Sequence, residues 1–222
     1  MKHIVIDLEM NSLAKQYKEE KLICNSEIIQ IGAVLLDEQY QEIGSFSTLV
    51  KPQYNEQIEK KYEKLTGINT EMVQDAPIFQ KAIEQFFLWI HSIEEEIQLY
   101  QWSESDCEQI TSELKLKKIQ PSAIDQCILE RIQDFQKEFG DTLGVSKALS
   151  LKEAVMYAGI DFDGRMHDAL WDAKNTANLL KIIRTPELRA EALESVIEAF
   201  TPKAVGTSLG DLIKFGGLDV SA

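Results

Sequence analysis

The chain begins with Lys2-His3-Ile4-Val5-Ile6-Asp7-Leu8-Glu9-Met10, and the prediction of the fold starts from this segment. Its apolar run Ile4-Val5-Ile6 predicts a short strand covered on both faces, as in the middle of an α/β sheet. Side chains of a strand alternate between faces, so Asp7 and Glu9 point the same way. Two carboxylates beside an apolar core are costly unless a cation lies between them, and a divalent ion is the usual solution. The alternative is that the strand has ended and both carboxylates are solvated in a loop.

Composition limits the classes of protein that the sequence can encode. The chain has 222 residues and 44% of them are hydrophobic, which is enough for one domain with an appendage. A formal net charge of −14 argues against a protein that coats nucleic acid, but not against an enzyme that acts on a nucleic-acid end. No apolar stretch is long enough for a membrane span, so we expect a soluble, cytoplasmic protein. The three cysteines lack Cys-x-x-Cys spacing, which predicts reduced thiols and no structural zinc.

The order of predicted elements indicates a mixed sheet with helices on it. Strands over 27–36 and 43–50 follow the first strand through turns too short for a helical crossover, which predicts an antiparallel three-stranded meander. A fourth strand is predicted over 96–102 and an extended piece over 122–125. Helices are predicted over residues 56–65, 68–73, 77–93, 106–116, 126–139, 150–159, 169–184 and 186–200. The whole is an α/β sandwich, with a helix and a glycine-dotted tail over 186–222 outside the main domain, 1–185.

Three further ionisable residues stand at positions where helices begin. Asp106 follows the fourth strand, and in α/β sheets such strand-to-helix junctions gather at one rim with other strand ends. The alternative for Asp106 is a helix-start aspartate that the macrodipole favours. We expect Ser103 or Ser105 to cap this helix. His167 lies in the loop before a helix, and Asp172 lies about one turn into it. This offset allows a mobile histidine to lie over a site whose floor includes a fixed carboxylate.

Five side chains occur in this order along the predicted elements: Asp7, Glu9, Asp106, His167 and Asp172. The set resembles the DEDDh branch of the 3′–5′ exonuclease superfamily, whose fold is ribonuclease-H-like. The resemblance covers residues 1–185, where 27–34 is similar to the family's second strand and 65–68 to its loop beside the terminal nucleotide. It implies an α/β fold in which an antiparallel three-strand meander plus parallel strands are sandwiched by helices. It also implies an enzyme, a hydrolase that removes nucleotides from single-stranded 3′ ends of RNA or DNA.

The resemblance also implies a metal site with two divalent ions, Mg²⁺ or Mn²⁺, on four carboxylates: Asp7, Glu9, Asp106 and Asp172. Asp7 would bridge both ions. Glu9 and Asp172 would hold the ion that activates water, and Asp106 would support the other. Two cations can stabilise the charge that builds on the oxygens of a phosphodiester under attack, and carboxylates suit these ions. His167 would be the general base, since an unperturbed pKa of about 6.5 suits proton acceptance near neutral pH.

Substrate contacts follow from the same resemblance. Met10, Leu65 and Thr66 would flank the terminal base and sugar, and ordinary core packing is the alternative for Met10 and Leu65. Two carboxylates depart from the family's pattern. Glu104 lies where a small or apolar residue is common, and it can be a bystander, an obstacle to a long strand, or a ligand. Asp168 lies beside His167, and we interpret it as the helix cap.

Two other functions fit parts of the sequence. One is a catalytically silent adaptor that binds a nucleic acid or a protein on an exonuclease fold, which the acidic surface and the tail favour. The other is an oligoribonuclease-like enzyme for very short oligonucleotides, because such enzymes share the compact Asp7-Leu8-Glu9-Met10 start. Retention of all five ionisable residues argues against the adaptor, since clustered, unpaired carboxylates are costly to keep. The choice between RNA and DNA depends on a contact to the 2′-hydroxyl, which the sequence does not place.

Overall fold

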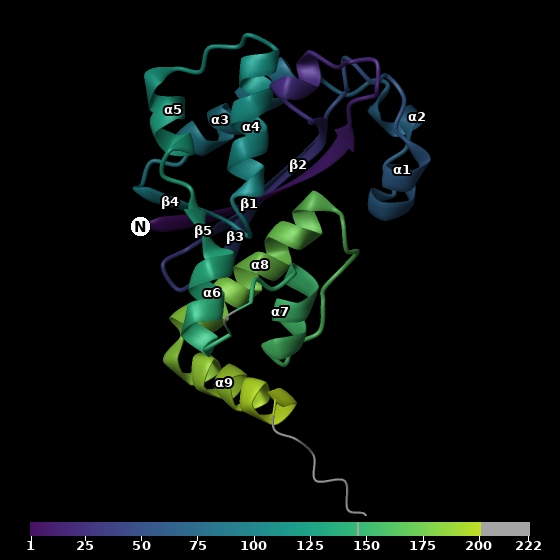
Figure 1. Cartoon of the computed structure of the whole chain (residues 1–222). Helices are drawn as coiled ribbons and strands as arrows, with labels where there is room; N and C mark the ends of the chain where they lie inside the picture. Colours follow the sequence, from purple (N-terminus) through teal and green to yellow (C-terminus); the bar gives the residue numbers. More distant parts are fainter. Residues whose placement is uncertain (146, 201–222) are drawn as a thin grey trace, which may run out of the picture.

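Strand β1 (Lys2–Ser12) lies in the middle of a five-stranded sheet with the order β3-β2-β1-β4-β5 (Figure 1). This is a computed structural model, and it describes residues 1–145 and 147–200. β2 (Ser26–Leu36) pairs antiparallel with β1 and with β3 (Glu42–Leu49), whereas β4 (Ile97–Gln101) and β5 (Gln133–Asp134) run parallel to β1. The predicted mixed α/β sheet, a meander plus parallel strands, is therefore confirmed. The expected tail, 202–222, lies outside the described residues.

Two layers of helices cover the sheet. The helices are α1 (Lys60–Thr66), α2 (Thr70–Val73), α3 (Phe79–His91), α4 (Ser105–Leu116), α5 (Ala123–Leu129), α6 (Phe135–Leu143), α7 (Leu151–Tyr157), α8 (Ala169–Arg184) and α9 (Pro186–Phe200), with a 3₁₀ turn η1 (Glu20–Leu22). α3, α4 and α5 lie on one side of the sheet in Figure 1, and α6, α7 and α8 lie on the other. α9 packs on the second group through Ala192 and Val196.

The side chains of β1 divide between these layers. Ile4, Ile6 and Leu8 are buried in a core with α3, α4 and α5, while Val5 is buried in a second core with α6, α7 and α8. Because the side chains alternate, the odd-numbered positions of β1 that follow Val5 also face the α8 layer. The strand thus directs two carboxylates toward α8 while its even-numbered side chains hold it in the opposite core.

Several predicted helix ends are confirmed. Gly67 ends α1 in the left-handed conformation, with φ of +75°. Ser150 caps α7 in a capping box, and Asp168 caps α8 by accepting from the N–H groups of Leu170 and Trp171. The helix predicted over 56–65 begins only at Lys60. The N–H groups just before it bond instead to side chains of Asn11 and Thr70, at 3.2 and 3.0 Å.

The prediction for residues 122–139 is wrong in detail. Ala123 to Leu129 is helical because Ser122 and Asp125 form a capping box, where the sequence suggested an extended piece. The predicted helix 126–139 is broken after Leu129, and two of its residues form strand β5 against β4. Asp134 then caps α6. Pairing with a distant strand decides this break, and helical spacing along the sequence cannot reveal it.

The expected serine cap of α4 is also wrong. The hydroxyls of Ser103 and Ser105 bond to each other at 2.7 Å, and neither caps the helix. The side chain of Gln101, at the end of β4, accepts from the N–H of Cys107 at 2.8 Å. The strand that precedes α4 therefore also satisfies its first turn.

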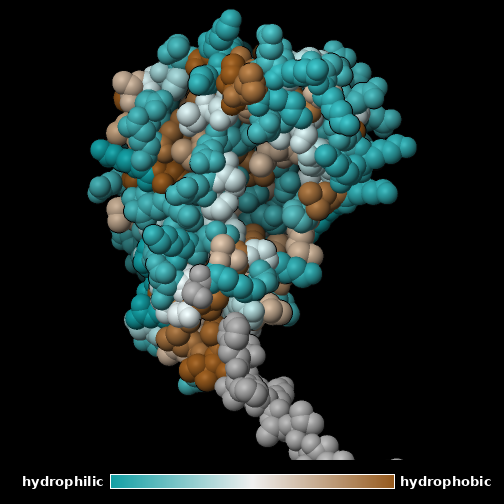
Figure 2. Space-filling model, in the orientation of Figure 1, coloured by the Kyte–Doolittle hydropathy of each residue, from teal (hydrophilic) through white to brown (hydrophobic). Residues whose placement is uncertain are grey.

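The surface and the thiols agree with the composition. Figure 2 shows a face covered mainly by hydrophilic side chains, as a net charge of −14 leads us to expect. The cysteines, Cys24, Cys107 and Cys127, are free thiols, which confirms the prediction. Among the helices described between residues 1 and 200, none combines the length and the apolar character needed to cross a membrane.

Candidate active site

Asp7 and Glu9 lie within β1 and not in a loop after it. The strand continues to Ser12, and it pairs Asp7 with Gly32 and Glu9 with Gln30 on β2. The alternative of two carboxylates solvated in a loop is therefore excluded. Glu9 is only 7% exposed, although it is ionisable. A bulge in the pairing follows Glu9, at the point where the strand leaves the acidic site.

Gly32 and Gln30, the β2 residues that pair with Asp7 and Glu9, position α8 on the sheet. A Cβ at Gly32 would overlap the main chain at Ala169 and Leu170, so a glycine is needed for the close approach. The side chain of Gln30 accepts from the N–H of Ala169 at 3.1 Å and so satisfies the first turn of α8. The N-terminal turn of α8, which carries Asp172, is thereby fixed beside Asp7. Neither role was foreseen from the sequence, because both depend on contacts between β2 and α8, which lie far apart in the chain.

The loop before α8 is held at its two ends. The side chain of Asn175 makes two hydrogen bonds to the main chain of Asp163. It accepts from the N–H at 2.9 Å and donates to the carbonyl oxygen at 2.8 Å. Gly164, at φ of +71°, leaves room for the indole of Trp171. His167 has φ of +60°, a left-handed conformation that costs on the order of 1 kcal/mol for a residue other than glycine. Local strain of this kind is typical of functional sites.

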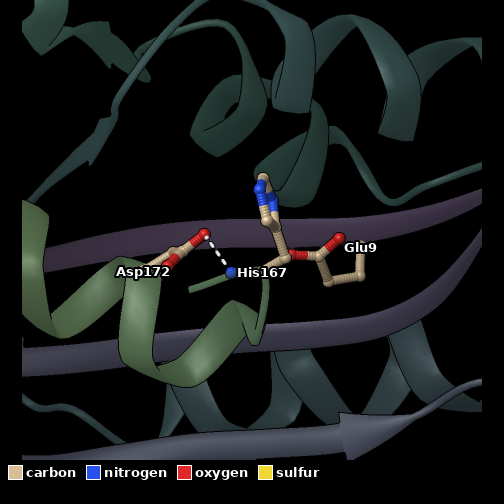
Figure 3. A group of neighbouring side chains, drawn as sticks. All are labelled: Glu9, His167 and Asp172. Atoms are coloured by element: carbon tan, nitrogen blue, oxygen red, sulfur yellow. Dashed lines mark hydrogen bonds between the residues drawn. The ribbon is translucent and has the colours of Figure 1, made fainter. Parts of the chain in front are cut away.

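Glu9, His167 and Asp172 come together at the end of this loop (Figure 3). One ligand atom from each lies within 4.8 Å of the others, which is close enough to share a metal ion. The main-chain N–H of His167 donates to Oδ2 of Asp172 at 3.2 Å, as the dashed line in Figure 3 shows. The other oxygen, Oδ1, is buried and has no hydrogen-bond partner among the described residues. A buried carboxylate oxygen without a donor fits a cation.

Asp106 and the acids of β1 meet in one open cleft of 380 Å³ between β1, α4, α1 and the His167 loop. Asp106 is 4% exposed in the first turn of α4. The cleft is lined by Asp7, Leu8, Glu9, Met10, Ser26, Tyr62, Leu65, Trp102, Ser103, Ser105, Asp106, His167 and Asp172. All five predicted ionisable residues are therefore in one place, although they come from three separate parts of the chain.

The carboxylates of the cleft repel one another. Burial, followed by the neighbouring acids Asp106, Asp172 and Glu9, raises the pKa of Asp7 well above its usual range. Burial and adjacent carboxylates raise the pKa of Glu9 to about 8, and burial is the main cause that raises the pKa of Asp106 to about 8. The pKa of Asp172 rises to about 6, chiefly through burial. The cleft is therefore short of positive charge.

The pKa of His167 moves the other way. Burial and then the charge of Arg165 lower it below its usual value. The imidazole is therefore neutral near pH 7, the state in which it can accept a proton.

The predicted substrate contacts are placed differently from one another. Met10 and Leu65 line the cleft, and Leu65 is 45% exposed there. Thr66 is buried, and its hydroxyl donates to the carbonyl of Tyr62 and accepts from the N–H of Ile68. Thr66 therefore stabilises the turn through these hydrogen bonds and is not among the residues that line the cleft. Glu104 is exposed at the start of α4 and is not among the residues that line the cleft.

Two further residues on the cleft wall, Ser26 and Tyr62, were not identified as site residues from the sequence. The hydroxyl of Tyr62 bonds to Ser12 at the end of β1, so α1 is fixed to the strand that carries the acids. A tyrosine at helical spacing looks like core, and only the contact between α1 and β1 makes it part of a site.

The chain belongs to the exonuclease family RNase_T, whose family model matches residues 4–180. The resemblance to the DEDDh branch is thereby confirmed. Enzymes with this fold generally depend on divalent metal ions, and Glu9, His167 and Asp172 form a possible site for one.

Among curated relatives, the chain is 28% identical over 227 residues to mouse (Mus musculus) ERI1 exoribonuclease 2, an alignment that covers 93% of this chain and 32% of the relative. It is 29% identical over 163 residues to rat (Rattus norvegicus) 3′-5′ exoribonuclease 1, with 69% of this chain and 45% of the relative covered. The chain thus spans about a third of the first relative's length and under half of the second's.

Solved structures share the fold. The nuclease domain of 3′hExo, a DEDDh family member bound to rAMP, superposes with a TM-score of 0.69 at 22% identity, over 81% of this chain and 90% of that one. Cell-death related nuclease 4 (CRN-4) has a TM-score of 0.69 at 26% identity, over 81% of this chain and 62% of that one. The predicted ribonuclease-H-like exonuclease fold is confirmed.

Proposed function

We propose that this chain is a metal-dependent 3′–5′ exonuclease that hydrolyses phosphodiester bonds at the 3′ end of single-stranded nucleic acid. The observation that carries the proposal is one cleft that is lined by four mutually repelling carboxylates together with His167. Family membership supports the reaction class, and the names of the relatives, exoribonucleases, support a nucleic-acid substrate. We assign the activity to residues 1–185, and 186–222 to a C-terminal helix and tail.

The donor set of the cleft fits Mg²⁺ or Mn²⁺. Four carboxylates would hold two such ions: Asp7, Glu9, Asp106 and Asp172. These are hard oxygen ligands, and the free Oδ1 of Asp172 is a ligand atom that has no other partner among the described residues. When bound, the two ions would neutralise the charge that builds on the phosphate oxygens during hydrolysis.

Other residues of the cleft would accept the proton from water and position the terminal nucleotide. His167 accepts a proton from the attacking water as general base, and its lowered pKa keeps it ready to do so near pH 7. The bond from its main chain to Asp172 ties the position of the histidine loop to that of a metal ligand. Met10 and Leu65 give the cleft an apolar wall for the terminal base and sugar. Thr66 holds the turn that presents Leu65.

The test is hydrolysis of matched single-stranded RNA and DNA oligonucleotides by the full chain, with Mg²⁺, with Mn²⁺ and with chelator. We expect metal-dependent shortening from the 3′ end. His167→Ala should lower kcat about 10²- to 10⁴-fold, the usual contribution of a general base. Asp7→Asn should abolish activity at low metal concentration. Asp75→Asn is the matched control, because Asp75 is exposed in the turn before α3.

Full activity of both site variants would contradict the roles, and no hydrolysis by the unchanged chain would contradict the function. A length series separates this activity from that of an oligoribonuclease-like enzyme, which would act only on very short strands. A catalytically silent adaptor would bind the strands without shortening them.

A further inference from the structure

Arg165 is a cationic residue at the rim of the cleft that the proposed mechanism does not use. It lies two residues before His167, and its side chain is exposed. Burial raises the pKa of Glu9, and the charge of Arg165 opposes that rise, so the guanidinium lies within electrostatic range of the acids. Within the described part of the chain, this guanidinium has no hydrogen-bond or ion-pair partner. Its donors are therefore available to a ligand.

The guanidinium of Arg165 packs on Gly67. A Cβ at Gly67 would overlap the guanidinium at Cζ and at both terminal nitrogens, so the group fills the space that glycine leaves open. Gly67 has φ of +75° and ends α1, directly after the turn that presents Leu65 to the cleft. The contact joins the loop before α8 to the turn after α1. A long, flexible side chain is thus held between two walls of the cleft.

The charges around the cleft make a cation necessary at this place. The described residues that line it include four acids and no lysine or arginine, and the chain as a whole carries a net charge of −14. A nucleic-acid strand carries one negative charge for each phosphate, so this surface repels it beyond the reach of bound metal ions. A fixed guanidinium at the rim is the group best suited to offset that repulsion.

We propose that Arg165 binds a backbone phosphate of the strand as it enters the cleft, and that Gly67 is the platform that holds the guanidinium in position. This inference rests on the proposed exonuclease function. The guanidinium lies against Gly67, and its N–H donors have no partner among the described residues, which suits a charge-assisted contact to phosphate oxygens. A lysine has the same charge but lacks the planar group and the paired N–H donors of a guanidinium.

The alternative is that Arg165 only holds the His167 loop in place through its contact with Gly67. The two roles differ in what they change. A phosphate contact contributes to strand affinity and to its dependence on salt, because each neutralised phosphate releases counterions. A packing contact affects the turnover rate and the stability of the loop, and leaves the dependence on salt unaltered.

The experiment measures binding of a short 5′-labelled single strand to the full chain in Mg²⁺, as a function of salt concentration. All proteins carry His167→Ala, so that the strand stays intact. In this background Arg165→Gln is compared with Arg165→Lys and with Lys81→Gln. The last is a matched loss of one charge, since Lys81 is 67% exposed on α3 and paired with Glu84 away from the cleft. Hydrolysis by the chain with His167 intact is followed in parallel, and melting temperatures confirm folding.

Arg165→Gln is expected to raise Kd roughly tenfold or more, as for loss of a charge-assisted hydrogen bond. It should also reduce the slope of log K against log salt by about 0.7. Arg165→Lys should keep the slope and lose part of the affinity, and Lys81→Gln should match the parent. An unchanged Kd and slope in Arg165→Gln, or equal losses in Lys81→Gln, would overturn the assignment while leaving the exonuclease function intact. A chain that neither binds nor hydrolyses the strand would overturn both.

Discussion

Two groups of buried acids in this molecule have opposite surroundings. In the first, the paired cluster, Glu27 and Glu113 are fully buried, and Lys117 bridges them at 3.0 and 2.6 Å. Glu27 also accepts from three main-chain N–H groups, and Glu113 from that of Ile28. The second is the site cluster of Asp7, Glu9, Asp106 and Asp172. Its cleft has no lysine or arginine among the lining residues that the structure describes.

The difference shows how a structural cluster is told from a functional one. Burial raises the pKa of Glu113 as well, but the paired cluster has a cation and main-chain donors of its own, and it fixes α4 to the start of β2. The site cluster leaves carboxylates with raised pKa values and one oxygen without a donor. Buried charges need compensation, so the site cluster calls for a partner from outside the chain.

The largest effect is expected from breaking the paired cluster. Lys117→Met should destabilise the fold by about 3–5 kcal/mol, because two buried carboxylates lose their cation. Chemical denaturation measures the change. Lys115→Met is the matched control, since Lys115 is exposed on the same helix, and it should shift stability by less than about 0.5 kcal/mol. Equal stabilities of the two variants would show that the paired cluster does not hold charged carboxylates.

A smaller effect is expected where α8 approaches the sheet. Gly32→Ala should destabilise the fold by about 1–3 kcal/mol, because the added methyl overlaps the main chain of α8. It should also lower exonuclease activity, since the first turn of α8 carries Asp172. Gly44→Ala on β3 is the control, because the nearest atoms to its Cβ are at 3.8 Å. Normal activity of Gly32→Ala would mean that the site tolerates a shift of this helix.

Removing a charge from the site cluster should stabilise the metal-free chain, whereas removing Lys117 from the paired cluster should destabilise it. Its raised pKa values mean that, without metal, the folded state binds more protons than the unfolded state between about pH 4 and pH 8. Stability of the metal-free chain should therefore fall as pH rises through that range. Asp7→Asn should flatten the fall and stabilise the chelated protein at pH 8 by on the order of 1 kcal/mol.

Thermal unfolding in chelator at several pH values measures this effect. Added Mg²⁺ should raise the melting temperature of the unchanged chain most at pH 8, because metal and protons compete for the same carboxylates. Less stability for chelated Asp7→Asn than for the unchanged chain would show that the acids of the site cluster do not repel one another.

The smallest effect is expected at Asp168, which borders the site cluster and caps α8. Asp168→Asn should change stability by less than about 0.5 kcal/mol, because asparagine caps helices as well as aspartate does. The metal concentration needed for half-maximal activity should also stay the same. A clear increase in that concentration would make Asp168 a ligand and enlarge the site cluster.

Local sequence predicted the elements that carry their own signals. The alternation around Asp7, the glycine stop of α1 and the caps at Ser150 and Asp168 depend on residues near each other in the chain, and all are confirmed. The region 122–139 was mispredicted because strand β5 exists only through its pairing with β4. The cap of α4 was mispredicted because it comes from the preceding strand.

The candidate site divides in the same way. The five ionisable residues could be named from the sequence, because their types and order resemble those of a known family. Their surroundings could not be named. The role of Gly32 depends on the approach of α8, and that of Arg165 on contact with Gly67, about a hundred positions earlier in the sequence.

The mixed sheet, its central acidic strand and the set of candidate ligands could be predicted from the amino-acid sequence, since side-chain alternation and local capping are properties of neighbouring residues. Which buried acids are compensated within the chain depends on the three-dimensional fold. Glu27 and Glu113 look no different from Glu9 in the sequence, yet Lys117 lies between the first two, whereas the described residues that line the cleft around Glu9 include no lysine or arginine. Electrostatic compensation depends on distances in space, and folding sets those distances.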